Sequence, residues 1–211
     1  MSIRIDIKIL LFLVIFYITK QLDIYLLLML FIIFHELTHL TVAMLLGSKP
    51  ITMEINQIGC AISFKYKLED YNKKILKGNL VELKKVIIYI AGPLFNILVG
   101  IIALFFRLNS CIVYINIFIT IFNLICIYPL DGGRIIKSIL HIFLGEKRAY
   151  EIVLNISNIF FIILLILCSF LILKFHNVGI LIGIIYISAI KIKNSKDIRL
   201  KLKIIDIINK D

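Results

Sequence analysis

Residues 34–40, FHELTHL, place two imidazoles and a carboxylate inside an apolar stretch that runs from Ile24 to Leu46. His35 and His39 are four positions apart, so an α-helix would carry both rings on one face, about one turn apart. In the pattern H-E-x-x-H, the two histidines bind Zn²⁺ and the glutamate acts as a general base. The stretch therefore predicts a zinc site on a helix, with Glu36 as the catalytic residue.

A structural role is the alternative for these three polar side chains, which would then only hydrogen-bond neighbouring helices and hold them together. A carboxylate within a membrane is costly and usually functional. Helix association alone requires neither this spacing nor this trio of side chains. The metal site is therefore the favoured interpretation.

The rest of the chain has the composition of a membrane protein, because 61% of its 211 residues are hydrophobic and only 18% are charged. One soluble domain would carry far more polar surface. Six apolar stretches are apparent: Ile7–Thr19, Ile24–Leu46, Val86–Phe106, Ile112–Leu130, Ile152–Leu173 and Val178–Ile190. The second to fifth are long enough to span a bilayer, which takes about 20 residues, whereas the first and last are shorter.

The positive charge indicates the topology. Four segments hold 21 of the 24 Lys and Arg residues: 1–8, 47–85, 131–150 and 191–211. Only Lys20, Arg107 and Lys174 lie elsewhere. By the positive-inside rule, this distribution predicts an all-α polytopic membrane protein with about six spans and both termini in the cytoplasm. The net charge of +11 then reflects topology, and nucleic acid is not expected as a partner.

A catalytic zinc site also needs a third protein ligand and one open position. Asp131, in NLICIYPLDGGRI (Asn123–Ile135), is the outstanding acidic residue within or beside an apolar stretch. Pro129 before it and Gly132-Gly133 after it should break the helix and leave the carboxylate on a non-helical turn. Irregular backbone at membrane depth lines a cavity, so we expect Asp131 to complete the site. The alternative is an ordinary helix-ending turn at the cytoplasmic surface.

Residues 51–68 alternate apolar and polar side chains on both sides of a turn near 56–59. This period is typical of a β-hairpin. A small membrane-associated hairpin could offer its edge to an extended substrate by strand addition. It could equally cap the helix bundle.

The third apolar stretch contains AGPLFN (Ala91–Asn96), in which Gly92-Pro93 should kink the helix. Asn96 adds a polar amide about one turn further on. Asn96 is therefore a candidate for substrate binding near the active site. A packing kink with an interhelical hydrogen bond is the alternative.

HELTH, AGPLFN and NLICIYPLDGG, in this order, resemble the motifs of the site-2 protease family of intramembrane zinc metalloproteases. The likeness is greatest to the sporulation branch, which contains the stage IV sporulation protein FB and processes the pro-sigma-K factor. It covers about Ile24 to Gly145. The resemblance implies His35, His39 and Asp131 as zinc ligands and Glu36 as the catalytic residue. It also implies that Asn123 helps to hold the substrate near the scissile bond.

On this resemblance we expect a transmembrane metalloprotease domain at 1–192, in a bacterial cell membrane or forespore membrane. Its substrate would be a membrane-tethered precursor, with pro-sigma-K as a candidate, and membrane-protein inhibitors are further candidate partners. Residues 193–211 are expected to form a short basic cytoplasmic tail without the CBS domain that is typical of the sporulation branch.

Two other functions remain open. One is a membrane metal-binding carrier, in which Glu36 would be a metal ligand. The other is a general site-2-type protease that acts on anti-sigma factors or signal-peptide remnants.

Overall fold

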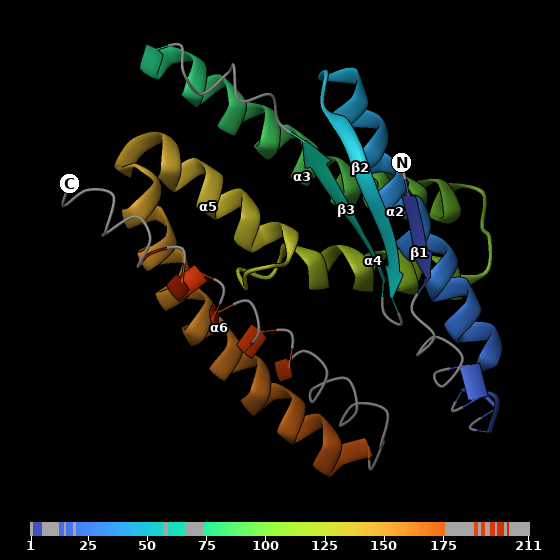
Figure 1. The fold of residues 1–211 in the computed structure, drawn as a ribbon. Helices are drawn as coiled ribbons and strands as arrows, with labels where there is room; N and C mark the ends of the chain where they lie inside the picture. Colours follow the sequence, from blue (N-terminus) through green and yellow to red (C-terminus); the bar gives the residue numbers. More distant parts are fainter. Residues whose placement is uncertain are drawn as a thin grey trace. The chain divides into compact units, whose positions relative to one another are not determined.

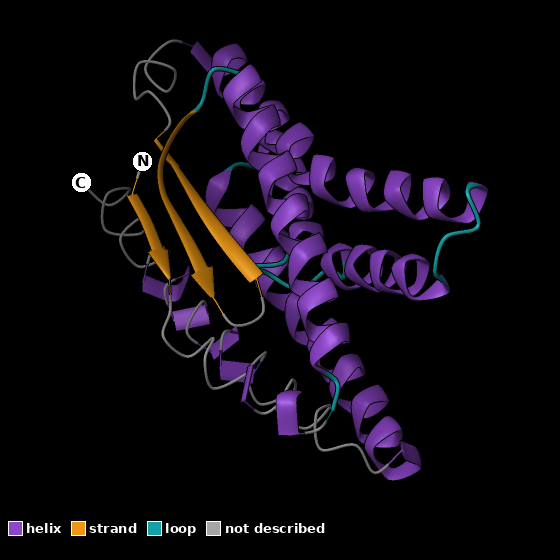
Figure 2. Cartoon of the chain, turned by 90° about the vertical axis from the view of Figure 1, so that its right-hand side faces the viewer, coloured by secondary structure: helices purple, strands orange, loops and turns teal. Residues whose placement is uncertain are grey.

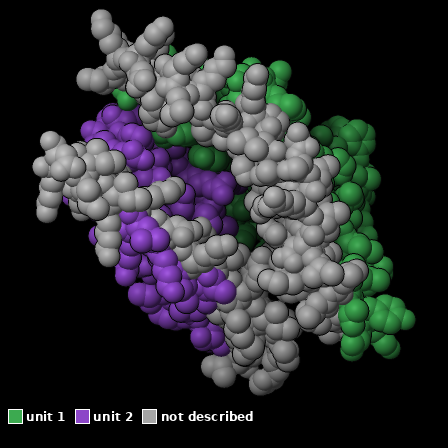
Figure 3. All heavy atoms as spheres, viewed as in Figure 1, with its two compact units in different colours: residues 1–123 green, residues 124–211 purple. Residues whose placement is uncertain are grey.

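A computed structural model gives the fold. It describes the following residues: 2–5, 13–14, 16–18, 20–56, 59–65, 74–175, 188–189, 191–192, 195–196, 198–200 and 202. The chain divides into two units, Met1–Asn123 and Leu124–Asp211 (Figure 3). The first and last predicted spans, Ile7–Thr19 and Val178–Ile190, lie largely outside the described residues, as does most of the tail 193–211.

Three helices among the described residues are long and apolar enough to cross a membrane: Leu22–Leu45, Asn79–Phe105 and Glu146–Phe170. They belong to three elements in Figure 1: α2 (Leu22–Leu45), α3 (Lys74–Phe105) and α6 (Glu146–Phe175). These helices overlap the second, third and fifth predicted stretches. The described part of the chain thus contains three candidate spans, whereas the sequence predicts about six.

The first unit also contains a three-stranded sheet with the order β1-β2-β3 (Figure 2). Strands β2 (Lys49–Asn56) and β3 (Gly59–Lys65) pair antiparallel, with Asn56 opposite Gly59. Strand β1 (Ser2–Ile5) pairs parallel with β2, and α2 contacts both β2 and β3. Of the predicted strand-like stretch 51–68, residues 51–56 lie in β2 and 59–65 in β3, and the others lie outside the described residues. Strand β1 was not predicted.

The fourth apolar stretch, Ile112–Leu130, does not stay helical to its end. Helix α4 (Ser110–Leu124) stops six residues earlier, and α5 (Asp131–Leu144) begins after an irregular segment. In the second unit, the backbone N–H of Tyr128 in this segment donates to Oγ of Ser157 on α6 at 2.9 Å. The expectation of a non-helical turn at Asp131 is therefore wrong, because the unwound segment lies before this residue and Asp131 begins a helix.

The glycine pair that follows Asp131 has a different role from the one expected. Gly132 and Gly133 do not break a helix; they form the buried first turn of α5. A Cβ added at Gly132 would collide with the carbonyl oxygen of Leu124, and one at Gly133 would lie 2.6 Å from the carbonyl carbon of Ile127. The missing side chains therefore allow the unwound segment to pack directly on the start of α5.

Candidate metal centre

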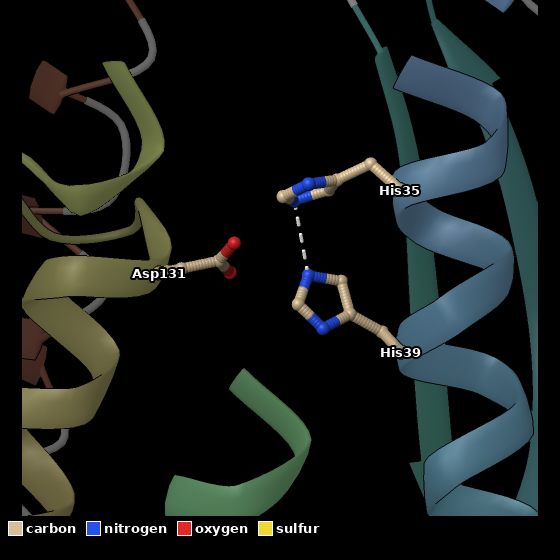
Figure 4. A group of neighbouring side chains, drawn as sticks. All are labelled: His35, His39 and Asp131. Carbon is tan, nitrogen blue, oxygen red and sulfur yellow. Dashed lines mark hydrogen bonds between the residues drawn. The ribbon is translucent and has the colours of Figure 1, made fainter. Parts of the chain in front are cut away.

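Helix α2 carries His35 and His39 on one face, as their spacing predicts (Figure 4). Both side chains are buried, with 1% and 6% of their surface exposed, and their Nε2 atoms lie 3.1 Å apart. Two imidazole nitrogens bound to one tetrahedral Zn²⁺, at about 2.0–2.1 Å each, would be roughly 3.3 Å apart. The pair therefore fits two ligand positions of a single zinc ion.

Helix α3 holds the outer nitrogen of each ring. Nδ1 of His39 donates to the carbonyl oxygen of Ile88 at 2.6 Å, and Nδ1 of His35 lies 3.0 Å from Nδ2 of Asn96. Metal-ligating histidines usually engage a backbone carbonyl or another polar group in this way, which orients the ring and leaves the second nitrogen for the metal. Asn96 is fully buried and faces an imidazole, so the structure favours a role beside the histidines over substrate binding.

Gly92 lies between these two contacts on α3. A Cβ at this position would lie 2.6 Å from Cε1 of both imidazoles and would collide with Nε2 of His39. Ile88, Gly92 and Asn96 are spaced by four residues and so form one stripe along the helix. From the sequence, Gly92 was expected only to kink the helix together with Pro93, although the four-residue spacing was a signal for a shared face.

Replacing Gly92 with Ala should therefore displace the two imidazoles and weaken zinc binding by at least about tenfold, since ligand orientation sets metal affinity. Gly100→Ala in the same helix is the matched control. Its Cβ would meet nothing closer than Cβ of Asn116 at 4.0 Å, and both variants gain helix propensity. Competition with a zinc chelator in detergent measures the affinity. Equal zinc affinity in the two variants would contradict the assigned role of Gly92.

The structure places the remaining predicted residues as follows. Glu36 is half-buried beside His35 on α2. Asp131 is buried in the first turn of α5, where the helix N-terminus favours a carboxylate. His35, His39 and Asp131 are each buried, and each offers a ligand atom of a kind that zinc accepts. Asn123, in the last turn of α4, is half-buried and donates from Nδ2 to the carbonyl oxygen of Ile119 at 3.1 Å.

Comparison with known proteins gives consistent results. The model of Peptidase family M50 matches residues 107–167. A zinc metalloprotease of Methanocaldococcus jannaschii is 31% identical over 153 residues, which are 67% of this chain and 41% of that protein. The comparisons support peptidase family M50.

The fold agrees with that of a solved structure. The structure of the site-2 protease from Methanocaldococcus jannaschii matches with a TM-score of 0.63 at 24% identity, and the match covers 87% of this chain and 86% of that one. The residues matched by the M50 family model include Asn123 and Asp131, whereas His35, Glu36 and His39 precede them. The histidine pair therefore supports a zinc site independently of the family-model match.

Proposed function

We propose that this chain is an intramembrane zinc endopeptidase of the site-2 type, which cuts a peptide bond within or beside the bilayer. The observation that carries the proposal is the buried pair His35 and His39, with Nε2 atoms 3.1 Å apart and both outer nitrogens held by α3. The match to the model of Peptidase family M50 supports the proposal. So does the similarity to a zinc metalloprotease, of which the chain covers 41%.

The proposed roles follow from the chemistry of each side chain. His35, His39 and Asp131 hold the metal, and bound zinc supplies a Lewis acid that acidifies water and polarises a carbonyl group. Glu36 accepts the proton of the attacking water and delivers it to the leaving amine. Asn123 holds the substrate strand near the scissile bond.

The rival function, a membrane metal-binding carrier, would use Glu36 as a ligand. Glu36 follows His35 directly, so the helix turns it about 100° from His35 and about 60° from His39, to one side of the face that carries the two rings. The proposed ligand set, His35, His39 and Asp131, does not include Glu36. A carboxylate that lies beside the metal without binding it is suited to act as a general base. This arrangement favours the hydrolase over the carrier.

A membrane-tethered precursor is the proposed substrate. The resemblance to the sporulation branch makes pro-sigma-K the first candidate, with anti-sigma factors and signal-peptide remnants as the others. A helical substrate hides its backbone amides, so it must be extended before cleavage. We propose that an edge of the β1-β2-β3 sheet receives the extended segment by strand addition. The proposed protein crosses the membrane six times and has both termini in the cytoplasm. The proposed location is a bacterial cell membrane or forespore membrane.

Metal removal tests the function directly. The chain is co-expressed with each candidate precursor, purified in detergent, stripped with a chelator and then given one equivalent of Zn²⁺. We expect cleavage to stop on chelation and to return with zinc but not with Mg²⁺, because Mg²⁺ prefers a set of oxygen ligands. Cleavage that continues at full rate in the stripped protein would rule out a zinc endopeptidase.

A further inference from the structure

The unwound segment between α4 and α5, residues 125–130, needs hydrogen-bond partners other than those of a helix. The N–H groups of Ile127 and Leu130 donate to carbonyl oxygens of the segment itself, at 2.7 and 2.8 Å. The N–H group of Tyr128 instead donates outside the segment, to Oγ of Ser157 on α6 at 2.9 Å. Ser157 therefore connects the backbone of this segment to the neighbouring helix.

Helix α5 occupies another side of the same backbone nitrogen. A Cβ added at Gly133, in the first turn of α5, would lie 2.6 Å from the nitrogen of Tyr128. The candidate span in α6 runs from Glu146 to Phe170, so Ser157 lies near its middle. Irregular backbone at membrane depth must find its partners within the protein or in a water-filled cavity. The hydroxyl of Ser157 supplies such a partner from within the protein.

The hydroxyl of Ser157 is used differently from three other hydroxyls on the helices. Thr38, Thr120 and Ser169 each donate to the carbonyl oxygen four residues earlier on their own helix, a local bond that is common for these residue types. Ser157 is 2% exposed and accepts from a separate segment of the chain. A bond within one helix positions no other element, whereas this bond fixes the unwound segment against α6.

Ser157 also lies at the end of the buried face of α6. Ala149, Val153 and Ser157 follow one another at four-residue intervals on this face, and all three are buried. Helix α5 contacts α6, but none of residues 158–170 is buried. Less packing is thus available beyond Ser157 to hold the segment in place, so the hydrogen bond carries more of that task.

We propose that Ser157 is a positioning residue that fixes the carboxylate of Asp131 through the backbone of Tyr128. Asp131 follows Tyr128 by three residues and begins α5. A segment that is held at Tyr128 therefore determines where this helix starts and where its first carboxylate lies. The inference rests on the proposed function, since it takes Asp131 as a zinc ligand.

Replacing Ser157 with Ala removes the acceptor and nothing else. We expect the amide proton of Tyr128 to exchange with solvent at least about tenfold faster, because its hydrogen bond is lost. Zinc affinity should fall by about tenfold, because the orientation of a ligand sets metal affinity. Ser157→Thr keeps the hydroxyl and should restore both properties.

Two controls on the same helix separate this role from packing. Ser169→Ala removes a hydroxyl that bonds only within α6. Val153→Ala removes buried volume one turn before Ser157 and deletes no hydrogen bond. Neither should change the exchange rate of Tyr128 or the zinc affinity. Effects of Val153→Ala as large as those of Ser157→Ala would assign them to packing and overturn the inference.

Amide exchange is measured by NMR of the full chain in micelles after chelation, with ¹⁵N-tyrosine labelling, because the chain has only nine tyrosines. Loss of one signal in Tyr128→Phe assigns the resonance, and chelator competition gives the zinc affinity. Unchanged exchange in Ser157→Ala would overturn the inference, as would faster exchange with wild-type zinc affinity. A wild-type chain that binds no zinc or cuts no precursor would refute the proposed function, whereas the exchange rates, measured without metal, would still decide whether Ser157 holds the segment.

Discussion

Replacement of Glu36 by Gln is expected to abolish cleavage while one zinc ion per chain stays bound. The amide has nearly the shape of the carboxylate, so helix α2 and the two adjacent imidazoles should be undisturbed. It cannot take a proton from water at neutral pH, and loss of a general base typically costs about 10²–10⁴-fold in rate. Precursor cleavage and elemental analysis of the purified variant measure the two properties together.

Glu151→Gln on α6 provides the matched control for this prediction, since Glu151 is an exposed glutamate and undergoes the same change of charge. It should cleave at the wild-type rate. If Glu36→Gln lost zinc together with activity, Glu36 would be a ligand and the carrier would be favoured. Cleavage by Glu36→Gln at near the wild-type rate would refute the assigned base.

Features that depend on length and local period could be predicted from the sequence. Helices α2, α3 and α6 follow from apolar runs of sufficient length. The shared face of His35 and His39 follows from their i, i+4 spacing, and the structure has both rings on that face. Each of these predictions uses only residues within one helix, which is why the pattern was sufficient.

Contacts between distant segments could not be predicted in the same way. The contact of Gly92 with both imidazoles and the contact of Ile88 with His39 join α3 to α2 across about 50 residues of chain. In the sequence, Gly92-Pro93 indicates only a kink. Strand β1 has four residues and a parallel partner that begins more than 40 residues later, in β2. Nothing in its own residues marks so short a strand.

The break before Asp131 shows the limit of local rules. Pro129 and Gly132-Gly133 correctly indicated an interruption of the fourth apolar stretch, but α4 ends at Leu124 and the glycines lie inside α5. Gly132 and Gly133 pack against the backbone of residues 124–127, where a side chain at either position would not fit. Glycine marks either a break or a close approach, and only the packing distinguishes the two.

Replacement of Asp131 by Asn should lower zinc affinity by more than the 10–100-fold typical of an outer-shell partner, because it removes an anionic ligand itself. Cleavage should fall in parallel. The change also removes a charge from the first turn of α5, which costs about 0.3–1 kcal/mol through the helix dipole. Asp23→Asn matches that cost, since Asp23 is an exposed acidic residue in the first turn of α2. The control should bind zinc as the wild type does.

A double-mutant cycle then tests whether Asp131 and His39 serve the same ion. Ligands of one metal depend on each other, so after loss of the first the second contributes little. We expect the zinc affinity of the combined Asp131→Asn and His39→Ala variant to be close to that of the weaker single variant. If the free-energy changes added, the two residues would act at separate sites. In that case Asp131 would not complete the site begun by the two histidines, and the protease would need another third ligand.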